Sequence, residues 1–448
     1  MRKFIAIVVC KLAAFVGRLI GKGSSKPGAL ALKICPNIIS QLTLPKTVVA
    51  VTGSNGKTST VELAVKILRE SGMKICWNRE GSNQTEGIAT MLICNATLGG
   101  KVNADAVVME SDERYARLTF KFLKPTHFMI LNILRDQMTR NGHPEFICGK
   151  IAEAVSSDMT VIVNADDPMS VLAARGAKLV GFGVEKGAVK GEGKLGVYDD
   201  GVYCPGCGGK MNYSYRVSGE MGGFACESCD LSRVDVKYAM KSFDEESGLI
   251  TLTDGTGKEL SMKCGINSLY HAYNMLAAYS LARELGVPAE KIEASISDYF
   301  LTNGRVRCWN HNGRKLVLLT SKHENSTSYD YSLEYAAKAG GNVLVIVDAV
   351  SRKYFTGETS WLWDIDFDRL ASDKVGKVFI AGKYVWDIAQ RLDYSAIPAE
   401  KIVVLEELDE ISEMLNSVSD DLYIITCFSD RDKFLSRLPS DAQERKEL

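Results

Sequence analysis

The most constraining feature of this chain is a β-branched run, Thr47–Thr52, that leads directly into the turn Gly53–Ser59, which reads Gly-Ser-Asn-Gly-Lys-Thr-Ser. Apolar residues follow on one helical face, at Val61, Ala64, Val65 and Leu68. A strand, a glycine-containing turn and a helix in this order form a loop whose backbone N–H groups face a polyphosphate at the positive end of the helix. The stretch therefore predicts a phosphate-binding loop.

The chemistry of this loop depends on two kinds of side chain. Lys57 can reach the β- and γ-phosphates of a nucleotide, and Thr58 or Ser59 can hold Mg²⁺. The general pattern G-x-x-x-x-G-K-T is incomplete, because its first glycine would fall at Val51. An ordinary strand–helix turn with two glycines is the alternative, but folding alone does not require Lys-Thr at a helix start. The candidate nucleotide ligands of the loop are Gly53, Asn55, Gly56, Lys57, Thr58 and Ser59.

Length and composition describe an ordinary folded protein of several domains. The 448 residues suggest two to four domains, and 46% hydrophobic and 24% charged residues are normal for a globular chain. The formal net charge of −1 gives no indication of general nucleic-acid binding. Twelve cysteines in a long chain without a secretory signature favour reduced thiols in a cytoplasmic protein, some of them on a metal.

The start of the chain is apolar but carries spaced cations. Lys11 and Arg18 interrupt the stretch Phe4–Ile20, so no run reaches the roughly 18–20 residues of a membrane-spanning helix. Cations beside large apolar residues are typical of an amphipathic helix that rests on a membrane surface, here the inner face. A helix packed on the protein's own core is an equally good interpretation. We expect residues 1–45 to form a helical segment that includes a Gly/Ser/Pro linker at 21–28.

Short apolar runs alternate with helix-like segments from Thr47 to about Val180, which predicts a parallel α/β sheet. Three of the runs end in polar clusters, Glu110–Glu113, Asn132–Gln137 and Asn164–Pro168. Ligand groups gather at the carboxyl ends of parallel strands, and carboxylates there suit Mg²⁺. Each acid alone fits a helix N-cap equally well. Their recurrence beside a phosphate loop favours a nucleotide–metal site.

Two Cys-x-x-Cys pairs lie in a stretch of different character, about 184–262, where glycines and short polar segments replace the α/β alternation. The pairs are Cys204 with Cys207 and Cys226 with Cys229. Their spacing predicts a tetrahedral Zn²⁺ site with a structural role, in an insertion that has little core of its own. A redox pair would explain one Cys-x-x-Cys but not two. Cations in this stretch are too sparse to favour nucleic-acid binding.

The last third of the chain returns to apolar strands separated by helix-like segments. Strands near 315–320, 341–350, 377–381 and 421–426 predict a Rossmann-like α/β domain over 306–448. This domain contains Ser360–Phe367, where two tryptophans precede two alternating acids, Asp364 and Asp366. Aromatic packing in a turn is the alternative interpretation of that run.

These stretches together resemble the Mur ligase family. Its phosphate loop has the shorter form T-G-[ST]-N-G-K-T-[ST], which is found at Thr52–Ser59 and accounts for the missing glycine. The segment Tyr273–Ala278 resembles the one whose asparagine meets the nucleotide in that family. The most similar branch has a Cys₄ insertion, a short N-terminal helical segment and an S-W-[IL]-W-D-x-D-F run, all of which this chain shows. Other residues that match family positions are Glu110, Asn132, Asp167 and the pair Gly304-Arg305.

The resemblance implies an α/β fold with a central ATP-binding domain over 46–305, a zinc-ribbon insertion at about 184–262 and a C-terminal domain over 306–448. It implies catalytic roles for Lys57 and Asp364, with Asp366 as the near alternative. Magnesium would be held by Thr58 and Glu110. Nucleotide contacts outside the loop would come from Asn132, Asp167, Asn274 and Arg305.

For function, the resemblance implies the ATP-dependent subunit of a glutamine-dependent amidotransferase in peptidoglycan biosynthesis. ATP would activate the α-carboxylate of D-glutamate in the lipid II stem peptide as an acyl phosphate, and ammonia would convert it to D-isoglutamine. The ammonia would come from a GatD-like glutaminase partner, because no glutaminase pattern is recognisable in this chain.

Two departures from the family and two other function classes remain open. Ser321–Tyr329 replaces a Lys-Asn-Pro-like segment, and Asp348–Arg352 replaces an Asn-Asp segment, so a related carboxylate is a possible substrate. A ligase that joins an amino acid to a peptide or a folate-like carboxylate is the first alternative. A zinc-ribbon ATPase with a binding role is the second, and the absence of a basic stripe disfavours its nucleic-acid version.

Overall fold

The structure is a computed structural model that describes residues 1–19, 24–79, 81–190, 196–297, 299, 306–349 and 357–445. The chain forms two compact units. The first consists of Met1–Leu134, His143–Lys194 and Asp200–Leu301. The second consists of Arg135–Gly142, Leu195–Asp199 and Thr302–Leu448.

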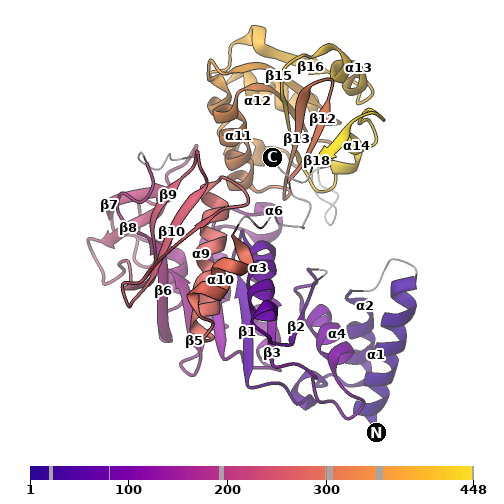
Figure 1. The fold of residues 1–448 in the computed structure, drawn as a ribbon, viewed down its shortest axis with the longest axis vertical. Coiled ribbons are helices and arrows are strands. Elements are labelled where there is room, and N and C mark those ends of the chain that lie inside the picture. Colours follow the sequence, from indigo (N-terminus) through magenta and orange to yellow (C-terminus); the bar gives the residue numbers. More distant parts are fainter. Residues whose placement is uncertain are drawn as a thin grey trace. The chain divides into compact units, whose positions relative to one another are not determined.

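The first unit is built on a nine-stranded sheet in the order β11-β10-β9-β6-β5-β4-β1-β3-β2 (Figure 1). All neighbouring strands from β9 to β2 are parallel, and β10 pairs antiparallel with both β9 and β11. The parallel sheet expected from the sequence is therefore confirmed. The strands are β1 (Thr47–Thr52), β2 (Ile75–Trp77), β3 (Ala106–Glu110), β4 (His127–Ile130), β5 (Thr160–Asn164), β6 (Lys178–Val184), β9 (Val236–Asp244), β10 (Leu249–Asp254) and β11 (Glu259–Lys263).

Helices cover both faces of this sheet, as a buried parallel sheet requires. Successive residues of β1 point to opposite faces, so Val49 and Val51 join one core while Val48 and Ala50 join the other. Helices α3, α9 and α10 lie together on the first face (Figure 1). The helices of the unit are α1 (Arg2–Leu19), α2 (Lys26–Ile34), η1 (Ile39–Gln41), α3 (Lys57–Glu70), α4 (Thr85–Asn95), α5 (Ala116–Thr119), α7 (Pro144–Ala152), α8 (Pro168–Ala173), α9 (Leu269–Glu284) and α10 (Ala289–Ile296).

The cysteine-containing stretch divides into two parts with different pairing. Strands β7 (Met211–Ser218) and β8 (Met221–Cys226) form a separate two-stranded antiparallel sheet. Strands β9, β10 and β11 instead extend the main sheet and add their apolar residues to its core. Of the strands in the stretch that we expect to be an insertion, only the β7–β8 hairpin lies outside the main sheet in the described part of the chain.

The second unit has a seven-stranded sheet in the order β16-β15-β14-β17-β13-β12-β18, parallel from β16 to β13. This is the expected C-terminal α/β domain. Its strands are β12 (Val306–His311), β13 (Arg314–Ser321), β14 (Gly341–Ile346), β15 (Val375–Ala381), β16 (Ile402–Leu405), β17 (Leu422–Cys427) and β18 (Gln443–Arg445). Its helices are α6 (Met138–Asn141), α11 (Ser326–Ala339), η2 (Ser360–Asp364), η3 (Phe367–Ala371), α12 (Val385–Asp393), η4 (Ala399–Lys401), α13 (Glu410–Ser417) and α14 (Arg431–Leu435).

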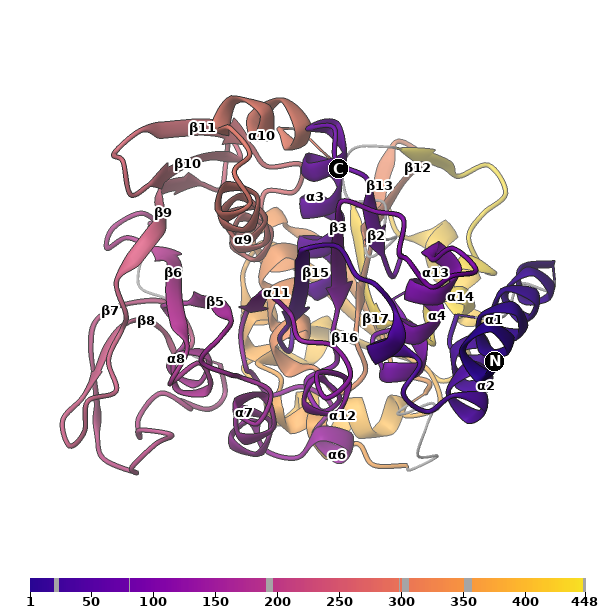
Figure 2. The ribbon, with the colours of Figure 1, turned by 90° about the horizontal axis from the view of Figure 1, so that it is seen from below.

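The first helix, α1, packs beside α2 and α4 (Figure 2). Its buried residues are mostly small, which lets the helices approach closely, and they are Ala6, Ile7, Cys10, Ala14 and Gly17. Among the described residues, no helix has the length and apolar character needed to cross a membrane.

Candidate functional site

The turn between β1 and α3 has the backbone that the sequence predicts for a phosphate-binding loop. Gly53 has φ 142° and Gly56 has φ 85°, values that side-chain-bearing residues rarely adopt. A Cβ at Gly56 would lie 2.4 Å from Oδ1 of Asn274. Helix α3 begins at Lys57, directly after the turn, so its first N–H groups have no partner within the helix. The loop thus presents the positive end of a helix.

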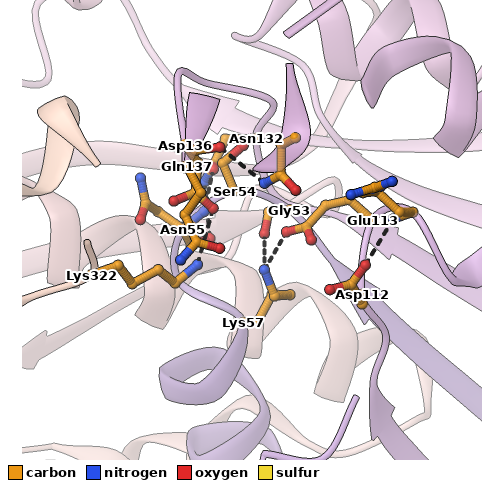
Figure 3. Close-up of polar contacts among 12 residues, drawn as sticks. Gly53, Ser54, Asn55, Lys57, Asp112, Glu113, Asn132, Asp136, Gln137 and Lys322 are labelled. Carbon is orange, nitrogen blue, oxygen red and sulfur yellow. Dashed lines mark hydrogen bonds and ion pairs between the residues drawn. The ribbon is translucent and has the colours of Figure 1, made fainter. Parts of the chain in front are cut away.

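Asn132, at the end of β4, holds this turn from the side. Its carbonyl accepts from the Ser54 N–H at 2.9 Å, and its Oδ1 accepts from the Asn55 N–H at 2.9 Å (Figure 3). Its Nδ2 donates back to the Asn55 carbonyl at 3.2 Å. The hydroxyl of Ser54 donates to the Leu134 carbonyl at 3.0 Å. In this structure the contacts of Asn132 therefore fix the loop conformation.

Lys57 is buried, and its ammonium contacts the Gly53 carbonyl and the carboxylate of Glu113 (Figure 3). Both partners of the ion pair are less than a tenth exposed. The pair places a cation inside the loop, where the phosphates of a nucleotide would compete with Glu113 for it. Glu113 belongs to the polar cluster that the sequence places after β3, but the family resemblance indicates Glu110 as the functional acid of that cluster. Spacing alone does not tell which acid of such a cluster reaches the lysine.

Three buried polar atoms near the loop have no hydrogen-bond partner in the described part of the chain. They are Thr52 Oγ1 at the end of β1, Ser111 Oγ after β3 and Asn274 Nδ2 on α9. Asn274 faces the loop, since its Oδ1 lies 3.4 Å from the hydroxyl of Thr60 on α3. Buried polar groups normally have partners. Thr52 and Ser111 at the carboxyl ends of parallel strands, with Asn274 facing the loop from α9, fit a nucleotide with its Mg²⁺.

The cluster after β5 holds neighbouring loops in place. Asp167 is fully buried and caps α8, and its carboxylate accepts from the N–H groups of Ile133 (2.8 Å) and Met169 (3.0 Å). Burial raises the pKa of Asp167 to about 6. Because Ile133 follows Asn132, this contact also steadies the residues around the phosphate loop. A nucleotide contact of Asp167 stays a prediction.

The neighbouring Asp166 accepts from Arg233 (2.8 Å) and from the hydroxyl of Tyr273 (2.9 Å). Burial raises the pKa of Asp166, although the Arg233 guanidinium opposes this shift. The Asp166 carbonyl accepts from Gly222 of β8 at 2.8 Å. Arg233 comes from the cysteine-containing stretch, so these contacts join that stretch to the end of β5. No sequence signal indicated this role, because Arg233 lies 67 residues from its partner.

The other predicted nucleotide and magnesium ligands are placed as follows. Glu110 is buried at the end of β3, where Asn78 bonds both its N–H (2.9 Å) and its carbonyl (3.0 Å). Thr58 and Ser59 lie in the first turn of α3, half-buried and buried respectively. Arg305 lies outside the described residues.

The four cysteines of the two Cys-x-x-Cys pairs converge, with their sulfur atoms all within 4.8 Å of one another. The Sγ atoms of Cys204 and Cys229 are 3.7 Å apart, and those of Cys207 and Cys226 are 3.5 Å apart. Four thiolates around one zinc ion at about 2.3 Å would be about 3.8 Å apart, so the donor set fits tetrahedral zinc and not disulfides.

Backbone N–H groups also point at three of these sulfurs. Gly206 donates to Cys204 and Gly209 to Cys207, both at 3.4 Å, and Ser228 donates to Cys226 at 3.3 Å. Such bonds stabilise thiolates, the form that binds a metal.

In the second unit, the aromatic run forms a short 3₁₀ helix, η2. Trp361 is buried against Tyr329, with ring centroids 5.3 Å apart, whereas Trp363 is exposed. Asp364 ends η2 with a mostly buried side chain, 3.9 Å from Arg135. Asp366 binds Arg369 at 3.1 Å, and its N–H donates to Asp330 at 2.8 Å. The two acids therefore have different partners, Arg135 for Asp364 and Arg369 for Asp366.

The segment that departs from the family, Ser321–Tyr329, binds the Arg135–Gly142 stretch within the second unit. Asp136 accepts from Asn325 (2.7 Å) and from Lys322 (3.3 Å), and Figure 3 shows the contact with Lys322. The Glu324 carbonyl accepts from the Gln137 N–H at 2.8 Å. The second departing segment is described only up to Ala349.

Comparison with known families identifies both parts of the chain. Residues 51–222 match the family model of the Mur ligase middle domain, and residues 323–430 match that of the MurT ligase C-terminal domain. The first match contains the phosphate loop and the polar strand ends. The second contains η2 with Asp364.

Two similar proteins match along most or all of their length. Both are named subunit MurT of lipid II isoglutaminyl synthase (glutamine-hydrolyzing). The Streptococcus pneumoniae protein is 28% identical over 455 residues, covering 100% of this chain and 99% of its own. The Staphylococcus aureus protein is 29% identical over 408 residues, covering 90% of each chain.

Solved structures support the same fold. A pseudomurein peptide ligase type C from Methanothermus fervidus superposes with a TM-score of 0.71 at 18% identity, covering 90% of this chain and 80% of its own. The MurF ligase of Thermotoga maritima, in complex with ADP, gives 0.61 at 14% identity, covering 91% and 83%. These identities establish the fold alone. The two family matches and the full-length relatives show a chain that contains a Mur ligase middle domain and a C-terminal domain of the MurT type.

Proposed function

We propose that this chain is the ATP-dependent subunit of a glutamine-dependent amidotransferase that amidates a carboxylate of the lipid II stem peptide. The observation that carries the proposal is the match, along nearly the whole chain, to relatives named as that subunit. The phosphate loop with Lys57 inside it supplies the chemistry that such a subunit needs.

The proposed reaction has two steps. The α-carboxylate of D-glutamate attacks the γ-phosphorus of ATP, which breaks the bond to ADP and forms an acyl phosphate. Ammonia then attacks the carbonyl carbon, phosphate leaves, and the product is the amide, D-isoglutamine. Both steps place negative charge on phosphoryl oxygens, which a positioned cation stabilises.

This chain contributes the phosphate-binding machinery of the first step. Gly53, Gly56 and the first turn of α3 would bind the phosphates, and Lys57 would leave Glu113 to neutralise the transferring group. Thr58 and Glu110 would hold Mg²⁺, which neutralises phosphate charge when bound. Asn274 would contact the nucleotide through its Nδ2, which has no hydrogen-bond partner among the described residues.

The Cys₄ cluster is proposed to bind one zinc ion with a structural role. Its support is the convergence of four sulfurs, with N–H bonds to three of them. Four protein ligands leave no open position for catalysis.

The ammonia source is proposed to be a GatD-like glutaminase subunit. The relatives are named as subunits of a glutamine-hydrolysing enzyme, and this sequence contains no recognisable glutaminase pattern. Asp364 is the proposed active-site acid of the C-terminal domain. The proposed location is the cytoplasm, with contact to the inner face of the membrane through α1.

Trapping with hydroxylamine tests the acyl phosphate without the partner. The purified chain with ATP, Mg²⁺ and lipid II should convert hydroxylamine into a hydroxamate of the stem peptide and release ADP. Omitting ATP, or replacing Lys57 by methionine, should abolish the product. A hydroxamate formed without ATP, or none formed with every component present, would contradict the proposed activation step.

The same assay distinguishes the proposed amidation from the alternative in which the chain ligates an amino acid. If the chain joins an amino acid, then amino acids should act as acceptors and yield a peptide bond, whereas ammonia should be a poor acceptor. The amidotransferase proposal predicts the reverse preference.

A further inference from the structure

The N-terminal helix exposes an apolar face that no other described residue covers. Its buried side faces α2 and α4, but large apolar side chains line the opposite side. Leu12 is 61% exposed, Phe15 59% and Leu19 72%. Soluble surfaces rarely gather several such side chains on one helix, and a contiguous apolar patch marks an interaction site. Phe4, Ile5 and Val16 of α1 are also exposed, and α2 exposes Leu30.

The charge of this region has one sign. Residues 1–61 contain nine lysines and arginines, and the first acid of the chain is Glu62. The remaining residues hold 45 cations against all 55 acids, so a chain with a net charge of −1 keeps its excess positive charge at one end. Arg2 and Arg18 on α1 are exposed, and so are Lys26 and Lys33 on α2.

We propose that the outer face of α1 and α2 binds the surface of a membrane that contains anionic lipids. The apolar side chains would enter the boundary between headgroups and acyl chains, and the cations would meet lipid phosphates. The helix would lie in the plane of the surface, since its length and cations do not suit a membrane span. Attachment of this kind would bring the first unit to a lipid-linked substrate.

The charge pattern also favours a lipid surface over a second copy of the chain. Two copies packed face to face would bring their cations together without any acid from this region to offset them, and like charges across an interface repel. An anionic membrane instead supplies the opposite charge over the whole face.

Co-sedimentation of the full chain with vesicles tests the proposal, and it needs neither nucleotide nor a glutaminase. The chain should bind vesicles of phosphatidylcholine mixed with phosphatidylglycerol, bind pure phosphatidylcholine much more weakly, and dissociate as salt is raised. Replacing both Leu12 and Phe15 by glutamate should abolish binding. Arg18→Glu should weaken it by more than roughly fivefold, because one cation is lost and an anion takes its place.

Trp386→Glu is the matched control, since Trp386 is as exposed as Phe15 (60% against 59%) but lies in the second unit. It should bind vesicles like the unchanged chain. Failure of the unchanged chain to bind anionic vesicles, or equal loss in the Trp386 control, would overturn the proposal. So would a dimer in size-exclusion chromatography that the Leu12/Phe15 variant abolishes without any vesicle binding, since the face would then belong to a second copy. Because the assay involves no turnover, its failure is distinct from a failure of the proposed amidation.

Discussion

Among single residues, the sequence predicts those of the phosphate loop. It does not predict the distant residues that pair with Lys57 and Asp166. The glycines, Lys57 and Thr58 lie in one short segment, so local spacing predicts them. The carboxylate that pairs with Lys57 is 56 residues away, and the guanidinium beside Asp166 is 67 residues away. Such pairs depend on which strands become neighbours, and one sequence alone does not determine that.

The buried ion pair of Lys57 and Glu113 predicts two effects of replacing Lys57, one on activity and one on stability. Lys57→Met should lower the turnover number at least about 100-fold, because a phosphoryl-stabilising cation is lost. It should also destabilise the first unit by about 3 kcal/mol, because the Glu113 carboxylate stays buried without its partner. Enzyme assay and thermal unfolding measure the two effects.

The double variant Lys57→Met with Glu113→Gln separates the effect on turnover from the effect on stability. It should recover most of the stability, since no uncompensated charge remains, but none of the activity. Recovered turnover in the double variant would show that Lys57 is needed only for folding.

Asp167 predicts a pH-dependent contribution to stability. Its pKa in the folded state is about 6, above the usual value of an aspartate, because burial disfavours the charged form. An acid with a raised pKa stabilises the fold fully below its unfolded pKa and loses that contribution as pH rises through about 6. Asp167→Asn keeps a hydrogen-bond acceptor for α8 but removes the titrating group. The melting temperature of the variant minus that of the unchanged chain should therefore rise between about pH 4 and 6. Above about pH 6 this difference should stay constant. A constant difference across this range would contradict the assignment.

At the scale of elements, the alternation of strands and helices predicts the parallel sheets of both units. Strands β3 and β4 flank β1 in the sheet, so their polar ends gather at the phosphate loop as parallel pairing requires. The sequence does not predict that β9, β10 and β11 belong to the main sheet. Their alternating polar residues also suit a hairpin of a separate insertion. The apolar residues on one face of these strands pack on the main core.

The Cys₄ cluster should hold one zinc ion per chain. Metal analysis should find it, and replacing Cys204 and Cys207 together by serine should remove it and expose the β7–β8 hairpin to proteolysis, since metal binding supplies much of the stability of such a module. An iron–sulfur chromophore, or a full zinc content in the double variant, would contradict the assignment.

The two acids of the η2 region should respond differently to substitution. Asp364→Asn should lower glutamine-dependent amidation about 100-fold with little change in melting temperature, if this acid is the catalytic one. Asp366→Asn should mainly lower stability, because Asp366 binds Arg369 within the fold. If only the Asp366 variant loses activity, the catalytic assignment has to move to that residue.

In the whole molecule, one chain contains a unit with the phosphate loop, a C-terminal α/β unit and an N-terminal helix with an exposed apolar face. The two family matches fall on the two units, and the relatives named as MurT subunits extend over both. The sequence predicts this organisation because each unit carries its own local pattern.

The most direct test of the central claim is mass spectrometry of lipid II after incubation with the chain, ATP, glutamine and a co-purified glutaminase subunit. We expect one carboxylate to be replaced by one carboxamide, on the D-glutamate of the stem peptide, in the presence of ATP only. An unchanged mass with every component active, or the addition of an amino acid in place of the amide, would contradict it.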